Sequence, residues 1–136
     1  MSLPAYVLKG SIRRALGLFN SITTSGIDTV SVANGLTAST TQTRVGGLAL
    51  TKRVNRVTTV ANASDAVTLP ALLPGQSVDV YNAGSHAMSV FPNGSADAID
   101  GGTAGAAVTL TNALRCRYTC VAANTIVSAQ LGAASA

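Results

Sequence analysis

Glutamate and tryptophan are absent from this sequence of 136 residues, and charged residues of all kinds make up only 10% of it. Hydrophobic residues make up 47%, too high a share for a disordered chain, which combines low hydrophobicity with high charge. No uninterrupted apolar run approaches the roughly 20 residues that a membrane-spanning helix needs. Lys9, Arg13 and Arg14 interrupt the only apolar stretch near Met1, which argues against a secretory signal. We therefore expect one domain, made in the cytoplasm and without a membrane partner.

Aromatic residues are also few, with three tyrosines and two phenylalanines. A small domain built on valine, alanine and threonine buries less area per residue than one built on aromatics. Such a domain gains stability from a partner surface. The composition therefore favours a homo-oligomer, either a dimer or a trimer, or a protein docked on a larger assembly.

Charge is distributed unevenly along the chain. Residues 1–56 hold seven basic residues against one aspartate, a net charge of +6, whereas residues 57–136 hold two arginines against four aspartates, a net charge of −2. A basic segment on a nearly neutral module points to an acidic partner, either nucleic acid or an acidic protein surface. Solubility is the alternative explanation. The predicted partner contacts are Arg13, Arg14, Arg44, Lys52, Arg53 and Arg56.

Short apolar runs separated by glycine, proline and asparagine fill the second half of the chain. This spacing is typical of a β-sandwich or barrel. We predict an all-β fold, a small antiparallel β-sandwich with an extended N-terminal arm. The expected strands cover residues 57–60, 67–69, 78–81, 88–91, 108–110, 115–121 and 126–131.

Three segments are expected along the chain. Residues 1–50 form a basic N-terminal arm and linker, with one candidate strand at residues 27–33 and a turn at Asn34-Gly35. Residues 51–131 form the β-sandwich module. Residues 132–136, rich in small side chains, form a flexible tail.

Alternation within the expected strands predicts which side chains face the core, because successive strand residues point to opposite faces. Val78 and Val80 are expected to point inward. The other inward sets are Cys116, Tyr118 and Cys120 in one strand, and Val127, Ala129 and Leu131 in the next.

No candidate catalytic or metal site rises above the background of this composition. Cys116 and Cys120 would lie about 13 Å apart on one strand face, beyond the ~7 Å limit for a disulfide. Two thiols without further ligands fall short of a zinc site, so we expect buried, reduced cysteines. His86 is expected in a surface turn, and Asp97 and Asp100 in a glycine-rich turn rather than a calcium loop. We expect no enzyme activity, cofactor or metal.

The module resembles a small β-module of tailed-bacteriophage virion proteins. The resemblance rests on Val-Thr-Thr-Val at 57–60, Val-x-Leu-Pro at 67–70, Pro-Gly at 74–75, Val-x-Val-x-Asn-x-Gly at 78–84 and Val-x-Pro at 90–92. It covers about residues 54–128. One departure is the missing tryptophan that often ends the last strand, where this chain has Ile126-Val127. A second is the absence of the long extension expected of a fibre.

A short chain with one module and a basic arm is similar to a capsid cement, or decoration, protein. That resemblance implies a jelly-roll-like subunit on the outer capsid surface, a virion location, synthesis in the host cytoplasm, and contacts with the major capsid protein and with itself. No direct contact with nucleic acid is expected in that case. Two alternatives stay open, a module of a trimeric head or tail fibre and a basic nucleic-acid-binding protein.

Overall fold

The structure of the protein, a computed structural model, describes residues 31–133. Residues 31–133 lie within one compact unit. The described part of the chain is all-β, and it contains no helix that could cross a membrane. The strands are β1 (Val32–Thr37), β2 (Leu48–Ala49), β3 (Val54–Thr59), β4 (Ala66–Thr68), β5 (Ser77–Asn82), β6 (Met88–Phe91), β7 (Ala98–Ile99), β8 (Val108–Leu110), β9 (Leu114–Ala122) and β10 (Thr125–Ala133).

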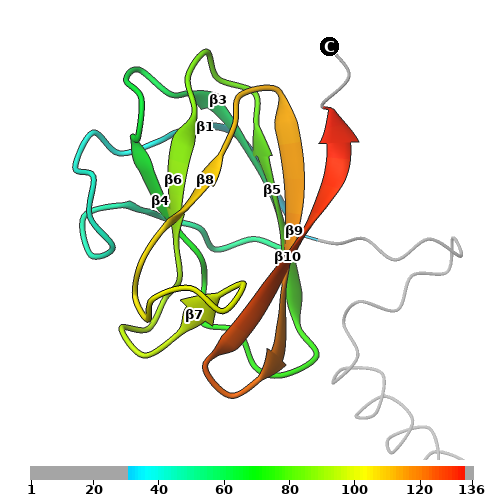
Figure 1. The fold of residues 1–136 in the computed structure, drawn as a ribbon. Helices are drawn as coiled ribbons and strands as arrows, with labels where there is room; N and C mark the ends of the chain where they lie inside the picture. The colour runs from blue at the N-terminus through cyan, green and yellow to red at the C-terminus, as the bar shows by residue number, and fades with distance from the viewer. Residues whose placement is uncertain (1–30, 134–136) are drawn as a thin grey trace, which may run out of the picture. The chain divides into compact units, whose positions relative to one another are not determined.

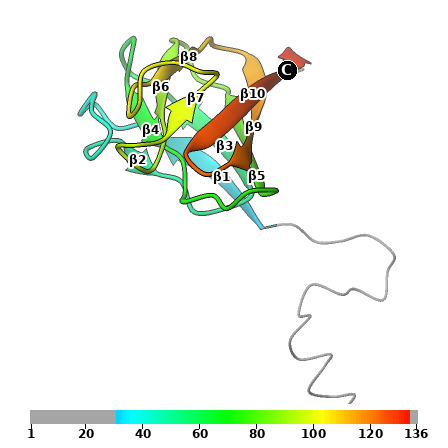
Figure 2. The same ribbon diagram turned by 60° about the horizontal axis from the view of Figure 1, so that its bottom comes forward.

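Successive strands alternate between two sheets. The six-stranded sheet has the order β1-β3-β5-β9-β10-β7, and the four-stranded sheet has the order β2-β4-β6-β8 (Figure 1). The chain therefore crosses from one sheet to the other after almost every strand, as in a β-solenoid. Figure 2 shows β2, β4, β6 and β8 along one side of the unit and β1, β3, β5, β9 and β10 along the other.

The antiparallel arrangement expected from the sequence is wrong for most strand pairs. The pairs β1–β3, β3–β5, β2–β4, β4–β6 and β7–β10 are parallel, and only β5–β9, β9–β10 and β6–β8 are antiparallel. Parallel neighbours need a long crossover connection. Here a strand of the opposite sheet supplies that crossover, so most turn residues between apolar runs mark crossings between sheets. The turn at residues 123–124, where β9 and β10 form a hairpin, is an exception.

One hydrophobic core lies between the two sheets, and β5 and β9 alternate toward it as predicted. Val78 and Val80 are buried, and so are the three predicted side chains of β9, Cys116, Tyr118 and Cys120. The inward set predicted for β10 is wrong, because Ile126 is only 3% exposed whereas Val127 is 40% exposed. Ile126 pairs with Cys120, next to an irregularity at Thr125, and this register turns Val127, Ala129 and Leu131 outward.

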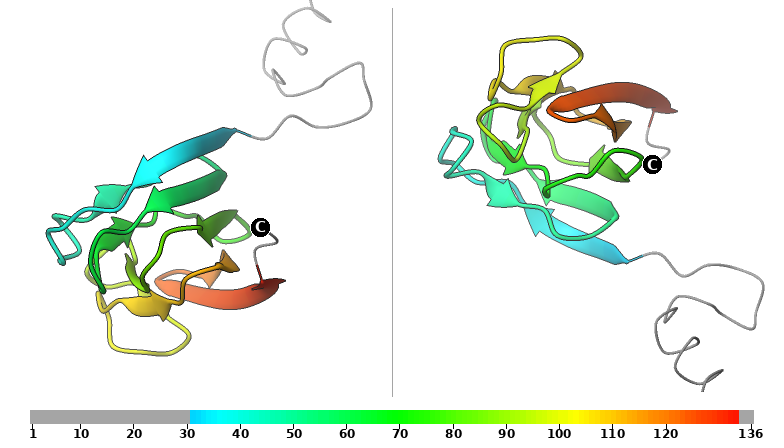
Figure 3. Two further views of the ribbon diagram at one scale, coloured as in Figure 1. Left: turned by 90° about the horizontal axis from the view of Figure 1, so that it is seen from above. Right: turned by 90° about the horizontal axis from the view of Figure 1, so that it is seen from below.

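The segment boundaries also differ from the prediction. The boundary expected at residue 50 falls inside the unit, because β1 and β2 pair with β3 and β4. The two views of Figure 3 show β1 beside β3 at the edge of its sheet. The turn expected at Asn34-Gly35 lies within β1, where Gly35 has a φ of +75° and the register shifts. The tail expected from Gly132 starts too early, since β10 runs to Ala133. Most of the predicted arm, residues 1–30, lies outside the described residues.

Asn82 joins the two sheets at the end of β5. Its side chain is fully buried, and its amide group donates hydrogen bonds to the carbonyl oxygens of Leu110 in β8 and of His86, each at 2.9 Å. Its Oδ1 accepts a hydrogen bond from Gly84 N–H at 3.1 Å. A Cβ at position 84 would lie 2.7 Å from Val60 Cγ2, so successive crossings stack too closely for any residue but glycine there.

We expect Asn82→Ala to lower the free energy of unfolding by about 2–4 kcal/mol, because it leaves the buried Leu110 carbonyl and Gly84 N–H without partners. Urea denaturation measures this loss. The matched control is Asn93→Ala, which removes one 3.3 Å hydrogen bond from a more exposed side chain and should cost less than half as much. Equal losses for both variants would contradict the role assigned to Asn82.

Tyr118 makes stability depend on alkaline pH. Burial raises the pKa of Tyr118 well above its ordinary value. In the unfolded chain tyrosine loses its proton near pH 10, so above that pH the unfolded state binds fewer protons than the folded state. The free energy of unfolding should therefore fall by up to about 1.4 kcal/mol per pH unit above pH 10. Urea denaturation between pH 9 and 11 should show this slope for the wild type and a smaller one for Tyr118→Phe; equal slopes would contradict it.

Candidate functional site

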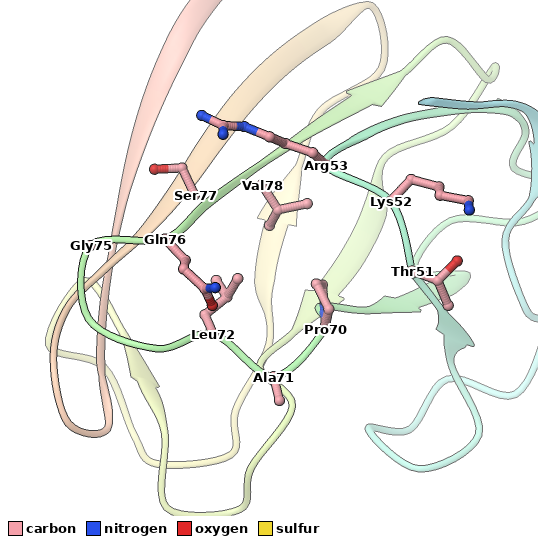
Figure 4. A pocket seen from close by; sticks show the side chains of 10 residues that line it. All are labelled: Thr51, Lys52, Arg53, Pro70, Ala71, Leu72, Gly75, Gln76, Ser77 and Val78. Atoms are coloured by element: carbon pink, nitrogen blue, oxygen red, sulfur yellow. The ribbon is translucent and has the colours of Figure 1, made fainter. Parts of the chain in front are cut away.

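A groove of about 320 Å³ lies between two connections that both lead from the four-stranded to the six-stranded sheet. Residues 50–53 join β2 to β3, and residues 69–76 join β4 to β5. These connections lie side by side because β3 and β5 are parallel neighbours. The groove is lined by Thr51, Lys52, Arg53, Pro70, Ala71, Leu72, Gly75, Gln76, Ser77 and Val78 (Figure 4).

Hydrogen bonds fix the backbone that carries the two cations. Buried Asn55 donates to the Lys52 carbonyl oxygen at 2.6 Å, and Asp79 N–H donates to the Arg53 carbonyl oxygen at 2.8 Å. Arg53 N–H donates to Ser31 Oγ at 3.2 Å. Lys52 and Arg53 are therefore exposed side chains on a rigid base. Figure 4 shows Arg53 extending over β5 toward Ser77, with Lys52 directed away from it.

The opposite wall of the groove is a tight turn held against β9. Gly75 N–H donates to the Cys120 carbonyl oxygen at 2.8 Å, and Cys120 N–H donates to the Gln76 carbonyl oxygen at 3.0 Å. Gly75 has a φ of +93°, a conformation that favours glycine. Gln76 Oε1 accepts a hydrogen bond from Leu73 N–H at 2.9 Å, which ties the Gln76 side chain to the turn.

The groove favours an anion. Among the residues that the structure describes, the charged side chains that line it are those of Lys52 and Arg53, and none of the lining residues carries a carboxylate. The nearest acid along β5, Asp79, is held on the outer face of the sheet by two hydrogen bonds from Arg117, at 2.7 and 2.9 Å. Hydrogen bonding to Asp79 raises the pKa of Arg117 above its ordinary value. An anionic group on this face would therefore meet donors from Arg53, while Asp79 is already paired with Arg117.

The structure does not gather the other predicted contact residues at this groove. Arg44 lies beside the four-stranded sheet, where it donates a hydrogen bond to the Asn93 carbonyl oxygen, and its own carbonyl oxygen accepts one from Thr68. Arg56 projects from the outer face of β3 and donates to Asn34 Oδ1 at 3.2 Å. Arg13 and Arg14 lie outside the described residues. Of the four predicted residues that the structure describes, Lys52 and Arg53 share a site.

The sequence reasoning missed a second basic cluster on the outer face of the six-stranded sheet. Arg115 lies over the ring of Tyr81, 5.0 Å from its centroid, and donates hydrogen bonds to the Tyr81 hydroxyl and to the Leu131 carbonyl oxygen. Arg56 lies opposite Tyr81 from the other side. Alternation with the inward set Cys116, Tyr118 and Cys120 predicts that Arg115 and Arg117 point outward. No sequence signal shows that β9 lies next to β5.

The remaining candidate residues have structural positions. Cys116 and Cys120 are buried and free, as predicted, and His86 is exposed in the connection between β5 and β6. Asp97 accepts a hydrogen bond from Gly94 N–H at 2.9 Å, and Asp100 accepts hydrogen bonds from the N–H and the hydroxyl of Ser128 in β10. Each aspartate thus anchors a turn. Residues 31–133 hold no group of three histidine, cysteine or acidic side chains that could bind a metal.

Comparisons with protein-family models, with curated proteins and with solved structures found no match for this chain.

Because both thiols are buried, we predict that they react slowly with thiol reagents in the native state. A thiol reagent such as dithiobisnitrobenzoate should react slowly with the folded protein and rapidly with both cysteines in urea. Val121→Cys is the matched control, because it places a third thiol on the same strand where the side chain is 52% exposed. That thiol should react rapidly in the folded protein. Rapid reaction of the wild type would contradict the burial of Cys116 and Cys120.

Proposed function

We propose that this protein is a structural, non-enzymatic virion protein of a tailed bacteriophage. It binds the outer capsid surface and cements neighbouring major capsid protein subunits against internal DNA pressure. The observation that carries the proposal is the place of the motif residues 78–84. Val78 and Val80 are buried in the core, Asn82 joins the sheets, and Gly84 allows the crossings to stack. The pattern shared with the phage module therefore coincides with the physical requirements of this fold.

The finer form of the subunit also belongs to the proposal. One core shared by two sheets supports a sandwich, whereas the parallel order of β1, β3 and β5 departs from the antiparallel strands of a jelly roll. The proposal keeps the β-sandwich and the extended N-terminal arm. The resemblance to a jelly roll is limited to the two packed sheets and does not extend to strand direction.

A cement subunit works by burying area on both sides of a joint between capsid subunits. One stable protein contact buries about 1,200–2,000 Å² in total, and repetition over the shell adds avidity. Exposed charge pairs contribute only about 0.2–1 kcal/mol each. Basic residues such as Lys52, Arg53 and Arg56 should therefore steer and orient the subunit, while apolar contact, with capsid and with other copies, should hold it.

Nucleic-acid binding is the second candidate, and one observation favours it. Arg56 and Arg115 flank Tyr81 on the outer face of the six-stranded sheet. Arginines around an aromatic ring can bind single-stranded nucleic acid by charge and stacking. A single aromatic residue offers a short platform, so we place this candidate behind the capsid proposal.

The proposal predicts a copy number and a salt response. The protein should co-purify with mature capsids at a stoichiometry close to that of the major capsid protein, whereas a fibre would be present in few copies. Moderate salt should slow its association with capsids without removing subunits already bound. Quantitative gel analysis of purified particles across a salt titration measures both. Steep dissociation together with duplex DNA binding at the same salt slope would contradict the capsid proposal and favour nucleic acid.

A further inference from the structure

Three exposed apolar side chains lie at the end of the six-stranded sheet beside the groove. Leu73 is 69% exposed, Val121 is 52% exposed, and Val127 is 40% exposed. The hydrogen bonds of Cys120 with Gly75 and Gln76 hold the turn that carries Leu73 next to the strand that carries Val121. Val127 pairs with Thr119, two residues before Val121 on β9. These side chains come from three separate segments, so the fold brings them together.

Hydrogen-bond donors border the same surface. Ser77 Oγ lies 2.8 Å from Thr119 Oγ1, and this hydrogen bond joins β5 to β9. Val127 of β10 pairs with Thr119 on the other side of β9. Figure 4 shows the Arg53 side chain extending over β5 toward Ser77. An apolar centre with a rim of donors is the composition of a protein-binding surface rather than of a site for a small polar molecule.

We infer that this surface, made of Arg53, Leu73, Ser77, Val121 and Val127, binds an extended acidic segment of a partner protein. The segment places a carboxylate against Arg53 and an apolar side chain against Leu73 and Val121. Charge decides the occupant, because the described residues that line the groove include two cations, Lys52 and Arg53, and no carboxylate. The groove, at about 320 Å³, has room for side chains of one segment but not for a folded element.

The inference rests on the proposed function only for the identity of the partner as a capsid protein. It goes beyond that proposal by naming the surface and the chemistry that the surface recognises. It also assigns different tasks to two adjacent cations. Arg53 contacts the carboxylate directly, whereas Lys52, which is directed away in Figure 4, adds only to the local potential.

The test uses the full chain and a defined probe, an acetylated eight-residue peptide of alternating leucine and glutamate. Titration of the ¹⁵N-labelled protein should shift amide signals at residues 51–53, 72–78 and 119–127. Peptides with glutamine or lysine in place of glutamate are the charge controls and should bind at least about tenfold more weakly, the loss expected when a charge-assisted contact is removed.

Two variants separate the two halves of the surface. Arg53→Gln should weaken peptide binding about tenfold, and Arg53→Lys should restore part of it. Leu73→Ser should also weaken binding, whereas Val45→Ser, a matched change at an apolar side chain that is 84% exposed in the connection between β1 and β2, should not. The three side chains replaced are all exposed, so the four variants should keep the fold; urea denaturation checks this.

Several outcomes would overturn the inference. These are no signal shifts with the leucine–glutamate peptide, equal binding of the lysine peptide, and shifts centred on Tyr81 and Arg115. Shifts of the same signals caused by raising the protein concentration alone would assign the surface to a second copy of this chain and would also overturn it. Peptide binding without any binding to purified capsids would refute the proposed function and leave the inference standing. Capsid binding that Arg53→Gln and Leu73→Ser leave unchanged would refute the inference alone.

Discussion

The hydrogen bonds of Asn82 are the constraint on which the rest of this fold depends. A buried amide that joins β5 to β8 links the two sheets at one end of the core, and its Oδ1 shapes the crossing that leads to β6. Apolar packing between sheets is not directional, so valines alone would allow the sheets to slide. A buried polar side chain whose partners are all in place permits one relative position. Gly84 then lets this crossing stack on the crossing that contains Val60.

Repeated crossing between sheets also creates the candidate binding surface. The returns from the four-stranded sheet into β3 and β5 end side by side, because β3 and β5 are parallel neighbours. The connection with Lys52 and Arg53 therefore lies against the turn at residues 73–76 and forms the groove between them. Backbone hydrogen bonds with Cys120 of β9 hold this turn in place. A functional surface on crossings of this kind rests on a rigid sheet, which suits a protein that must hold a partner in a fixed position.

Local signals predicted much of the strand content and failed wherever pairing mattered. The strands around Val78, Met88, Val108 and Tyr118 were predicted because each combines apolar residues with flanking turn residues. β7, with two residues, is too short to have a pattern of its own. The inward face of β10 was predicted wrongly because Val127 and Ile126 are equally apolar, and only the pairing of Ile126 with Cys120 chooses between them.

The sequence by itself determined that the described chain is all-β, which residues of β5 and β9 face the core, and that the thiols are buried. These properties follow from alternation and turn chemistry, which act over a few residues. Only the tertiary structure decided that most neighbouring strands are parallel, that Arg44 and Arg56 lie apart from Lys52 and Arg53, and that Leu73, Val121 and Val127 share one surface. The physical reason is that strand order depends on which sheet each crossing enters, and packing between segments far apart in the chain makes that choice.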